Sequence, residues 1–330
     1  RGEAAALQEA LEAQQDLVIA SAFGDALWDA AHTDLTFTML PSERGAFWSG
    51  VRESFEELSS LHPAENPQVR LARSRALLQA GHAMGGIRSG NRGEFEEALE
   101  AYAASRDDLV ELFESDRANR SYWSEAIEAQ LRVADSLRRT NQPTAAMKEY
   151  QRAIEIADAI DPGDDLAAQR QRSKPRFSLG QTAVHLGDAA LASEMFDEEV
   201  DARRARAGAH ADNANVRRDL AVALVSAGEL ALEMNQPQRS REMLNEAHEI
   251  RLALLEEFGD TRFRPTLERD VAVSTIALAL HEAHEGNGAP ARERMREAIR
   301  ILDALAQHSP DDARVVFTSA TGAVEYALAS

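Results

Sequence analysis

Residues 218–223 read Arg-Asp-Leu-Ala-Val-Ala, and residues 269–274 read Arg-Asp-Val-Ala-Val-Ser. The tripeptide Asn-Gln-Pro likewise stands at residues 141–143 and again at residues 235–237. Both tripeptides separate stretches that have the apolar spacing of helices, and their composition suits tight turns. A helix-turn-helix pattern that recurs along a chain is typical of a solenoid, whose hairpins stack because a single hairpin cannot bury its apolar face.

Small and large residues follow this repeat in a fixed order. A small residue lies in each helix of an expected hairpin, and a large apolar residue follows the second small residue four positions later. Small residues let two helices approach closely, and the large residue fills the groove between them. The steps between repeats are 48, 46, 48 and 51 residues. The first-helix small residues are Gly81, Ala134, Gly180, Gly228 and Ala279; the second-helix small residues are Ala98, Ala146, Ala192, Ser240 and Ala291; the large residues are Tyr102, Tyr150, Phe196, Leu244 and Met295.

Composition excludes several classes of function. The 330 residues carry 36 Lys and Arg against 56 Asp and Glu, a net charge of −20, which repels nucleic acid and anionic lipid. No cysteine is present, so the chain has no disulfide, thiolate metal site or cysteine nucleophile. No apolar run approaches the roughly 18–20 residues that a membrane-spanning helix needs. Alanine and leucine supply the apolar residues while aromatics make up only 5%, which favours helices over strands.

Leu179-Gly180, Ala183, Gly187-Asp188, Ala192 and Phe196 together resemble the small-and-large code of the tetratricopeptide repeat (TPR). The extra length over the usual 34-residue repeat falls in the second helix, as in His248–Phe258. Long repeats with an Arg-Asp-Leu-Ala-Val opening resemble the C-terminal repeat region of bacterial membrane-anchored serine/threonine kinases. This resemblance implies an all-α, right-handed superhelical solenoid of TPR-like hairpins. It also implies a bacterial membrane-anchored protein, in which the repeat region is either the cytoplasmic or the extracytoplasmic part.

The chain divides into three expected parts. Residues 1–66 are expected to form N-terminal helices that pack on the start of the solenoid, residues 67–310 five TPR-like hairpins, and residues 311–330 a capping helix. The chain begins at Arg1 and not at Met, so we interpret it as a piece of a larger protein.

The search for catalytic and cofactor motifs predicts a non-enzyme without metal or cofactor. His281 and His284 are three residues apart, whereas a metalloprotease helix needs histidines four apart, so they are interpreted as polar helix residues. The glycine-rich segment 85–93 lacks the lysine of a phosphate-binding loop. Kinase motifs are absent as well, and Arg218-Asp219 and Arg269-Asp270 are not catalytic loops, since no histidine precedes them.

The expected partner is a protein or peptide segment, and the chain is expected to be monomeric. Binding of nucleic acid is not expected, and neither is membrane contact by this fragment itself. First-helix positions of two neighbouring repeats carry a basic group that could select an acidic segment; with its neighbours the candidate site is Arg138, Arg139, Lys174, Arg176, Phe177, Gln181 and His185. Two alternatives stay open for the surface. The basic residues could pair locally with Glu128, Asp135 and nearby acids, or an acidic strip at 94–116 could bind a basic partner. A further alternative is a structural spacer or self-association scaffold with no dedicated ligand.

Overall fold

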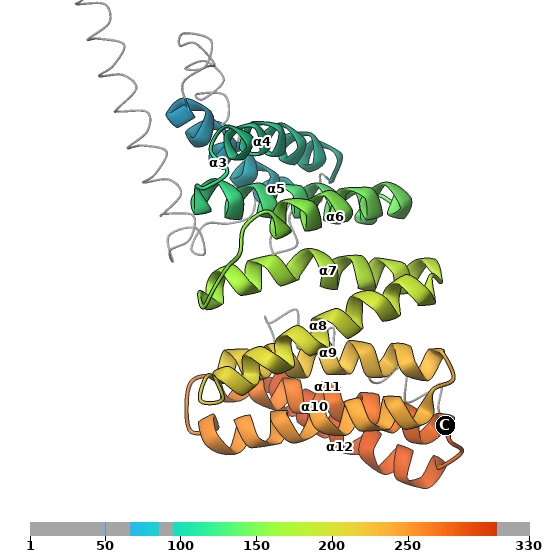
Figure 1. Ribbon diagram of the computed structural model, residues 1–330. Coiled ribbons are helices and arrows are strands. Elements are labelled where there is room, and N and C mark those ends of the chain that lie inside the picture. The colour runs from blue at the N-terminus through green and yellow to red at the C-terminus, as the bar shows by residue number, and fades with distance from the viewer. Residues whose placement is uncertain (1–49, 51–66, 86–94, 309–330) are drawn as a thin grey trace, which may run out of the picture. The chain divides into compact units, whose positions relative to one another are not determined.

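The structure is a computed structural model that describes residues 50, 67–85 and 95–308 (Figure 1). The helices expected within 1–66, nearly all of the glycine-rich segment and the expected capping helix 311–330 lie outside these residues. The described part consists of ten helices, α3 to α12, joined by turns and short loops, and contains no strand. The predicted all-α fold class is therefore confirmed.

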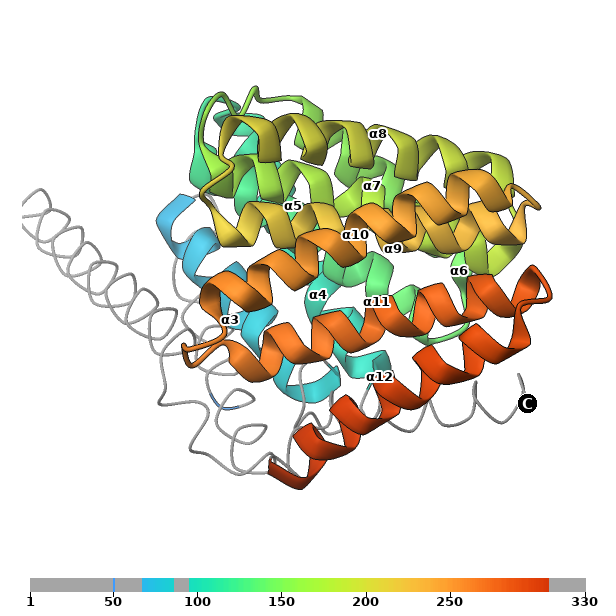
Figure 2. The ribbon, with the colours of Figure 1, turned by 90° about the horizontal axis from the view of Figure 1, so that it is seen from below.

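The chain forms two compact units, Arg1–Ser178 and Leu179–Ser330, and the boundary lies within one long helix, α7. The helices of the first unit are α3 (Pro67–Gly85), α4 (Phe95–Ser115), α5 (Arg120–Arg139), α6 (Pro143–Asp158) and the first part of α7 (Leu166–Leu186). The second unit contains the rest of α7, followed by α8 (Ala189–Ala209), α9 (Ala214–Glu233), α10 (Pro237–Phe258), α11 (Arg264–His284) and α12 (Gly288–His308). Within the second unit, α9, α10, α11 and α12 pack in chain order (Figure 2).

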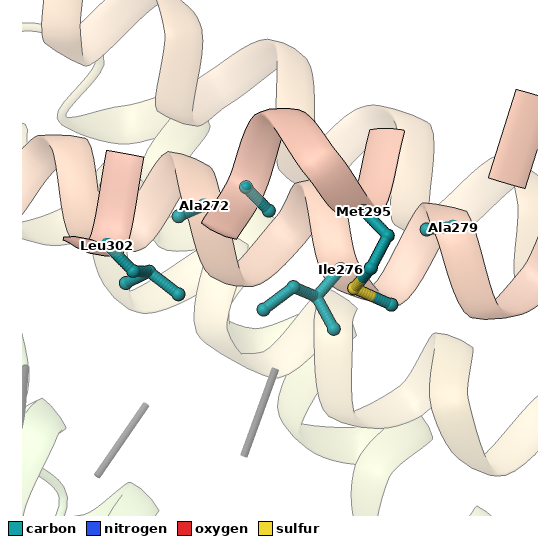
Figure 3. Close-up of a cluster of buried hydrophobic side chains, with 6 residues drawn as sticks. Ala272, Ile276, Ala279, Met295 and Leu302 are labelled. Carbon is teal, nitrogen blue, oxygen red and sulfur yellow. The ribbon is translucent and has the colours of Figure 1, made fainter. Parts of the chain in front are cut away.

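The small-and-large code lies where the helices of each hairpin cross. A Cβ atom added to Gly81 would stand 2.5 Å from the Tyr102 ring, and one added to Gly180 would stand 2.8 Å from the Phe196 ring. Such distances leave no room for a side chain, so glycine permits the close approach. In the last hairpin, Ala272, Ile276 and Ala279 of α11 meet Met295 and Leu302 of α12 in one buried cluster (Figure 3). The predicted crossing positions of Gly180 and Gly228 are confirmed.

One turn type joins the two helices in four of the hairpins. The residues after the first helix are Asn141, Gly187, Asn235 and Gly286, all in the left-handed region with φ of 59°, 74°, 56° and 82°. Glycine and asparagine adopt this conformation at low cost, which explains their place at the end of a helix. The next residue then donates its backbone N–H to a carbonyl five residues earlier, as Gln142 does to Leu137 at 2.8 Å. The turn residues identified in the sequence thus share one structural role.

Side-chain caps define the start of three first helices. Asn119, Asp165 and Asn213 each accept two backbone N–H groups from the first turn of α5, α7 and α9, at 2.9–3.3 Å. Each cap satisfies donors that the helix itself leaves without partners. The helices of residues 67–85 and 95–308 include none that is both long and apolar enough to cross a membrane.

Candidate partner-binding face

The first helices of the hairpins in the first unit are α3, α5 and α7, and polar contacts join them side by side. Arg75 of α3 donates to both carboxylate oxygens of Glu125 on α5, at 2.9 and 2.8 Å. On the other side of α5, the ammonium nitrogen of Lys174 on α7 lies 3.5 Å from Glu128 Oε2. Figure 1 shows α5 between the other two helices. The charged side chains on this side form what we call the first-helix face: Arg75, Glu125, Glu128, Arg132, Asp135, Arg138, Arg139 and Lys174.

An alternating row of charges runs along α5 at the centre of this face. Arg132 donates from Nε to Glu128 at 2.8 Å and from Nη1 to Asp135 at 3.2 Å. Burial raises the pKa of Glu128, but the positive charges of Arg132 and Lys174 outweigh burial and lower this pKa to about 2. Glu128 therefore stays ionised at neutral pH, and the row is held in one arrangement by opposite charges.

Two buried tyrosines of the small-and-large code contact polar residues of the first helices through their hydroxyl groups. The Tyr150 hydroxyl donates to Asp135 at 2.6 Å, and the Tyr102 hydroxyl lies 3.0 Å from Nδ1 of His82 on α3. Burial raises the pKa of both tyrosines, so their hydroxyls keep the proton. Asp135 and His82 each directly follow the small residue of their helix. In the first unit the large residue thus both fills the crossing and positions a polar group beside it.

The predicted basic group is distributed over several environments. Arg138 and Arg139 lie together in the last turn of α5 with exposed side chains, and the Arg139 guanidinium is 5.5 Å from the centre of the Phe95 ring. Lys174 contacts Glu128, as described above. Arg176 instead pairs with Asp158 of α6 at 2.6 Å. Local pairing, which the sequence left open, therefore occurs at Lys174 and Arg176.

The other three candidate residues lie on α7 at or beyond the end of the first unit. Phe177 is half-buried in the first unit, whereas Gln181 and His185 are exposed in the second. We therefore treat Arg138, Arg139 and Lys174 as the part of the predicted site that belongs to the first-helix face.

Four of the eight described acids in the acidic strip at 94–116 pair with basic residues, namely Asp107, Asp108, Glu111 and Glu114. The buried Asp108 accepts from Arg73 Nε at 2.8 Å, and Glu111 pairs with Arg70 at 2.6 Å. Both arginines come from α3, so these acids join the two helices of the first hairpin.

The repeated Arg-Asp pairs join successive hairpins of the second unit. Arg218 of α9 donates to both carboxylate oxygens of Asp270 on α11, and Arg269 also donates to Asp270. A second repeated contact comes from the second helices. Arg203 and Arg251 donate to the backbone carbonyls of Asp219 and Asp270, at 2.9 and 2.7 Å. The sequence identified these pairs only as a repeat signature; the recurrence of arginine at positions 203 and 251 was the signal for their contacts.

His281, which the sequence placed in a near match to a zinc motif, is a buried residue of the contact between α11 and α10. It is buried, and its Nδ1 lies 3.1 Å from the Ser240 hydroxyl on α10. Among the described residues, no group of three or more His, Cys, Asp or Glu could hold a metal ion.

Comparisons with known proteins define the class of fold. The chain is similar to BtubC (BKLC) from P. vanneervenii, with a TM-score of 0.60 and 16% identity over 81% of this chain and 92% of that one. It is also similar to RapI, with a TM-score of 0.50 and 15% identity over 80% of this chain and 77% of that one. The TPR-like repeats of a kinesin light chain from Podosopora anserina align with a TM-score of 0.45 and 16% identity, over 76% of this chain and all of that one.

These likenesses concern the fold, which is that of an all-α protein built from TPR-like helical hairpins. No protein-family model matches the chain, and no curated protein matches it.

Proposed function

We propose that this chain is a protein- or peptide-binding module that recognises an acidic segment along the first-helix face. The observation that carries the proposal is the continuity of that face, in which α3, α5 and α7 combine their charged side chains across the hairpins. A peptide that crosses several first helices meets one ordered surface, so little side-chain freedom is lost on binding. No catalytic step is assigned to the chain, which acts by positioning a partner.

Arg138 and Arg139 are the residues that give the face its preference for an acidic segment. Both are exposed at the same end of α5, where Arg138 lies close to the Tyr150 hydroxyl and Arg139 lies over the Phe95 ring. Neither forms an ion pair with another described residue. Their charges are therefore available to a carboxylate, whereas Arg132 is already shared by Glu128 and Asp135. The rest of the molecule is strongly acidic, so it would repel the same segment elsewhere.

Within a larger protein, such a module would serve as a regulatory or sensing part. The sequence resemblance to the repeat regions of bacterial serine/threonine kinases supports this role, and the site itself requires only that a partner segment be presented to the face. The proposal does not depend on the compartment in which the segment is met.

A binding screen with a matched control tests the proposal. Peptide arrays of acidic, neutral and basic sequences select ligands, whose dissociation constants are then measured by fluorescence anisotropy at 50 and 150 mM NaCl. We expect acidic ligands whose affinity falls with salt, because exposed charges are screened over about 8–10 Å. The double variant Arg138→Glu/Arg139→Glu should weaken binding by about tenfold or more. The control Lys148→Glu/Arg152→Glu makes the same charge change at two exposed positions of α6 and should leave binding unchanged.

Two results would contradict the proposal. One is acidic-ligand binding that the double variant leaves as tight as the parent at low salt. The other is a screen without ligands, together with light scattering that shows concentration-dependent self-association, which would favour a structural scaffold.

A further inference from the structure

Two histidines bind serines reciprocally across the contact between α10 and α11. Nδ1 of His248 on α10 lies 3.0 Å from the Ser274 hydroxyl on α11, and Nδ1 of His281 on α11 lies 3.1 Å from the Ser240 hydroxyl on α10. His281 is 1% exposed, and His248 is half-buried. Because α10 and α11 belong to successive hairpins, the two bonds help attach the last hairpin to the rest of the second unit (Figure 2).

The surrounding bonds assign the proton to Nδ1 in both rings. The Ser274 hydroxyl donates to the Val271 carbonyl at 2.9 Å, so its oxygen accepts the proton of His248 Nδ1. Arg241 Nε donates to His281 Nε2 at 3.4 Å, which requires a lone pair on Nε2 and leaves the proton on Nδ1. In the neutral form, each imidazole therefore carries its proton on Nδ1, and an added proton must enter at Nε2.

At His281, Nε2 faces the Arg241 guanidinium of α10 and the Glu285 carboxylate at the end of α11. Glu285 Oε2 lies 3.4 Å from Nε2 and is at the same time the ion-pair partner of Arg241. His284 is a further titratable neighbour, and Glu282 is held by Arg294 of α12 at 2.8 Å. A proton added at His281 Nε2 would point at the N–H group of Arg241 Nε, so the hydrogen bond between them is lost and two positive charges lie close together. Both cations then compete for the Glu285 carboxylate.

At His248, the added charge meets arginines from two helices. Arg251 of α10 and Arg294 of α12 oppose protonation, while Glu249 of α10 and Glu297 of α12 favour it. Burial, more than any of these charges, lowers the pKa of His248, and burial is also the main cause that lowers the pKa of His281. Both sites therefore disfavour the charged imidazole.

We infer that the α10–α11 contact is an acid-sensitive joint, which opens when His248 and His281 take up protons and so frees the α11–α12 hairpin from α10. As it opens, the imidazolium of His281 takes Glu285 as its partner, and Arg241 turns to solvent. The protons come from bulk water, and no covalent change is required. This joint is independent of the partner-binding proposal, which concerns the first unit.

The sign of the effect follows from proton linkage. An opened joint exposes histidines that take up protons near their ordinary pKa of about 6.5, whereas the closed joint takes them up only at lower pH. Closure is therefore unaffected above about pH 7 and is weakened as the pH falls through 6.5. One pH unit below 6.5, the closed-to-open ratio falls by at most about tenfold for each histidine, or about a hundredfold for both.

Hydrogen-exchange mass spectrometry on the whole chain tests the joint. Protection of α11 amides, corrected for intrinsic exchange, should fall by about threefold to a hundredfold between pH 7.5 and 5.5. Protection of α5 should change by less than twofold. The variant His248→Asn/His281→Asn keeps an amide donor but cannot titrate, so its α11 protection should be independent of pH. The control His284→Asn, at an exposed position of the same helix, should behave as the parent does.

An α11 protection that stays constant within twofold in the parent, or that falls as steeply in the double variant, would overturn the inference. If the double variant does not fold, an NMR titration of the parent decides the question. Midpoints below about 6.5 for both His248 and His281 support the joint, whereas a midpoint at or above about 6.5 for either histidine overturns it.

Discussion

Replacing Gly228 with alanine tests whether helix crossings control the stability of the second unit. A methyl group at Gly228 would stand 2.8 Å from both Cγ and Cδ2 of Leu244 and 3.4 Å from the Ser240 carbonyl oxygen. Leu244 is fully buried, so it can yield only by displacing other core side chains. Overpacking of this kind costs about 1–3 kcal/mol, while alanine gains about 1 kcal/mol over glycine as a helix former. The net expectation is a destabilisation of about 0–2 kcal/mol.

Gly208 of α8 provides the matched control, because nothing lies within 4 Å of its added Cβ. Gly208→Ala should therefore show only the gain in helix propensity, up to about 1 kcal/mol. Urea unfolding followed by circular dichroism should separate the two variants by about 1–3 kcal/mol. In a Leu244→Ala background the crowding disappears, and Gly228→Ala should then become stabilising. If Gly228→Ala stabilises the parent as much as Gly208→Ala does, the account of the crossing is wrong.

Other predictions concern caps and ion pairs. Asn213→Ala removes the acceptor for two N–H groups of α9 and should lower stability by about 1 kcal/mol in urea unfolding; an unchanged midpoint would exclude the cap. Glu128→Gln should lower the free energy of unfolding most at neutral pH, because the depressed pKa of Glu128 stabilises the folded state only while the carboxyl is ionised. The difference in unfolding free energy between parent and variant should shrink as the pH falls from about 4.5 towards 2. A difference that does not depend on pH would contradict the role of Arg132. Arg218→Met leaves the nearly buried Asp270 carboxylate with fewer hydrogen-bond donors, so it should lower the free energy of unfolding by about 1–3 kcal/mol. In an Asp270→Asn background the same substitution should have a much smaller effect, and additive effects of the two substitutions would contradict the pairing.

The hairpins could be predicted from the sequence because they depend on features a few residues apart. A helix crossing requires a small residue opposite a large one, and the spacing of Gly180 and Phe196 provides this directly. A helix end that turns back requires a left-handed residue, and Asn141 and Asn235 stand in that position. These requirements are local and steric, so each repeat carries them independently.

The ion pairs could not be predicted in the same way. Arg218 and Asp270 are 52 residues apart, and Arg218 meets this acid because α9 and α11 stack with one particular offset. Many other acids were available, since the chain has 56 acidic side chains for 36 basic ones. This excess also explains why Lys174 and Arg176 are paired locally. Arg138 and Arg139, in the exposed last turn of α5, form no such pair with a described residue.

The central claim is that a partner lies along the first-helix face, and a hydrogen-exchange footprint of the whole chain with a saturating acidic ligand from the screen tests it most directly. The account predicts increased protection in α3, in α5 and in the part of α7 before residue 179, with the largest increase near Arg138 and Arg139. It also predicts that, at a ligand concentration near the parent's dissociation constant, the footprint of the Arg138→Glu/Arg139→Glu variant is smaller than that of the parent by about fivefold or more. Protection confined to the second helices α4 and α6, with none in α5, would contradict the claim.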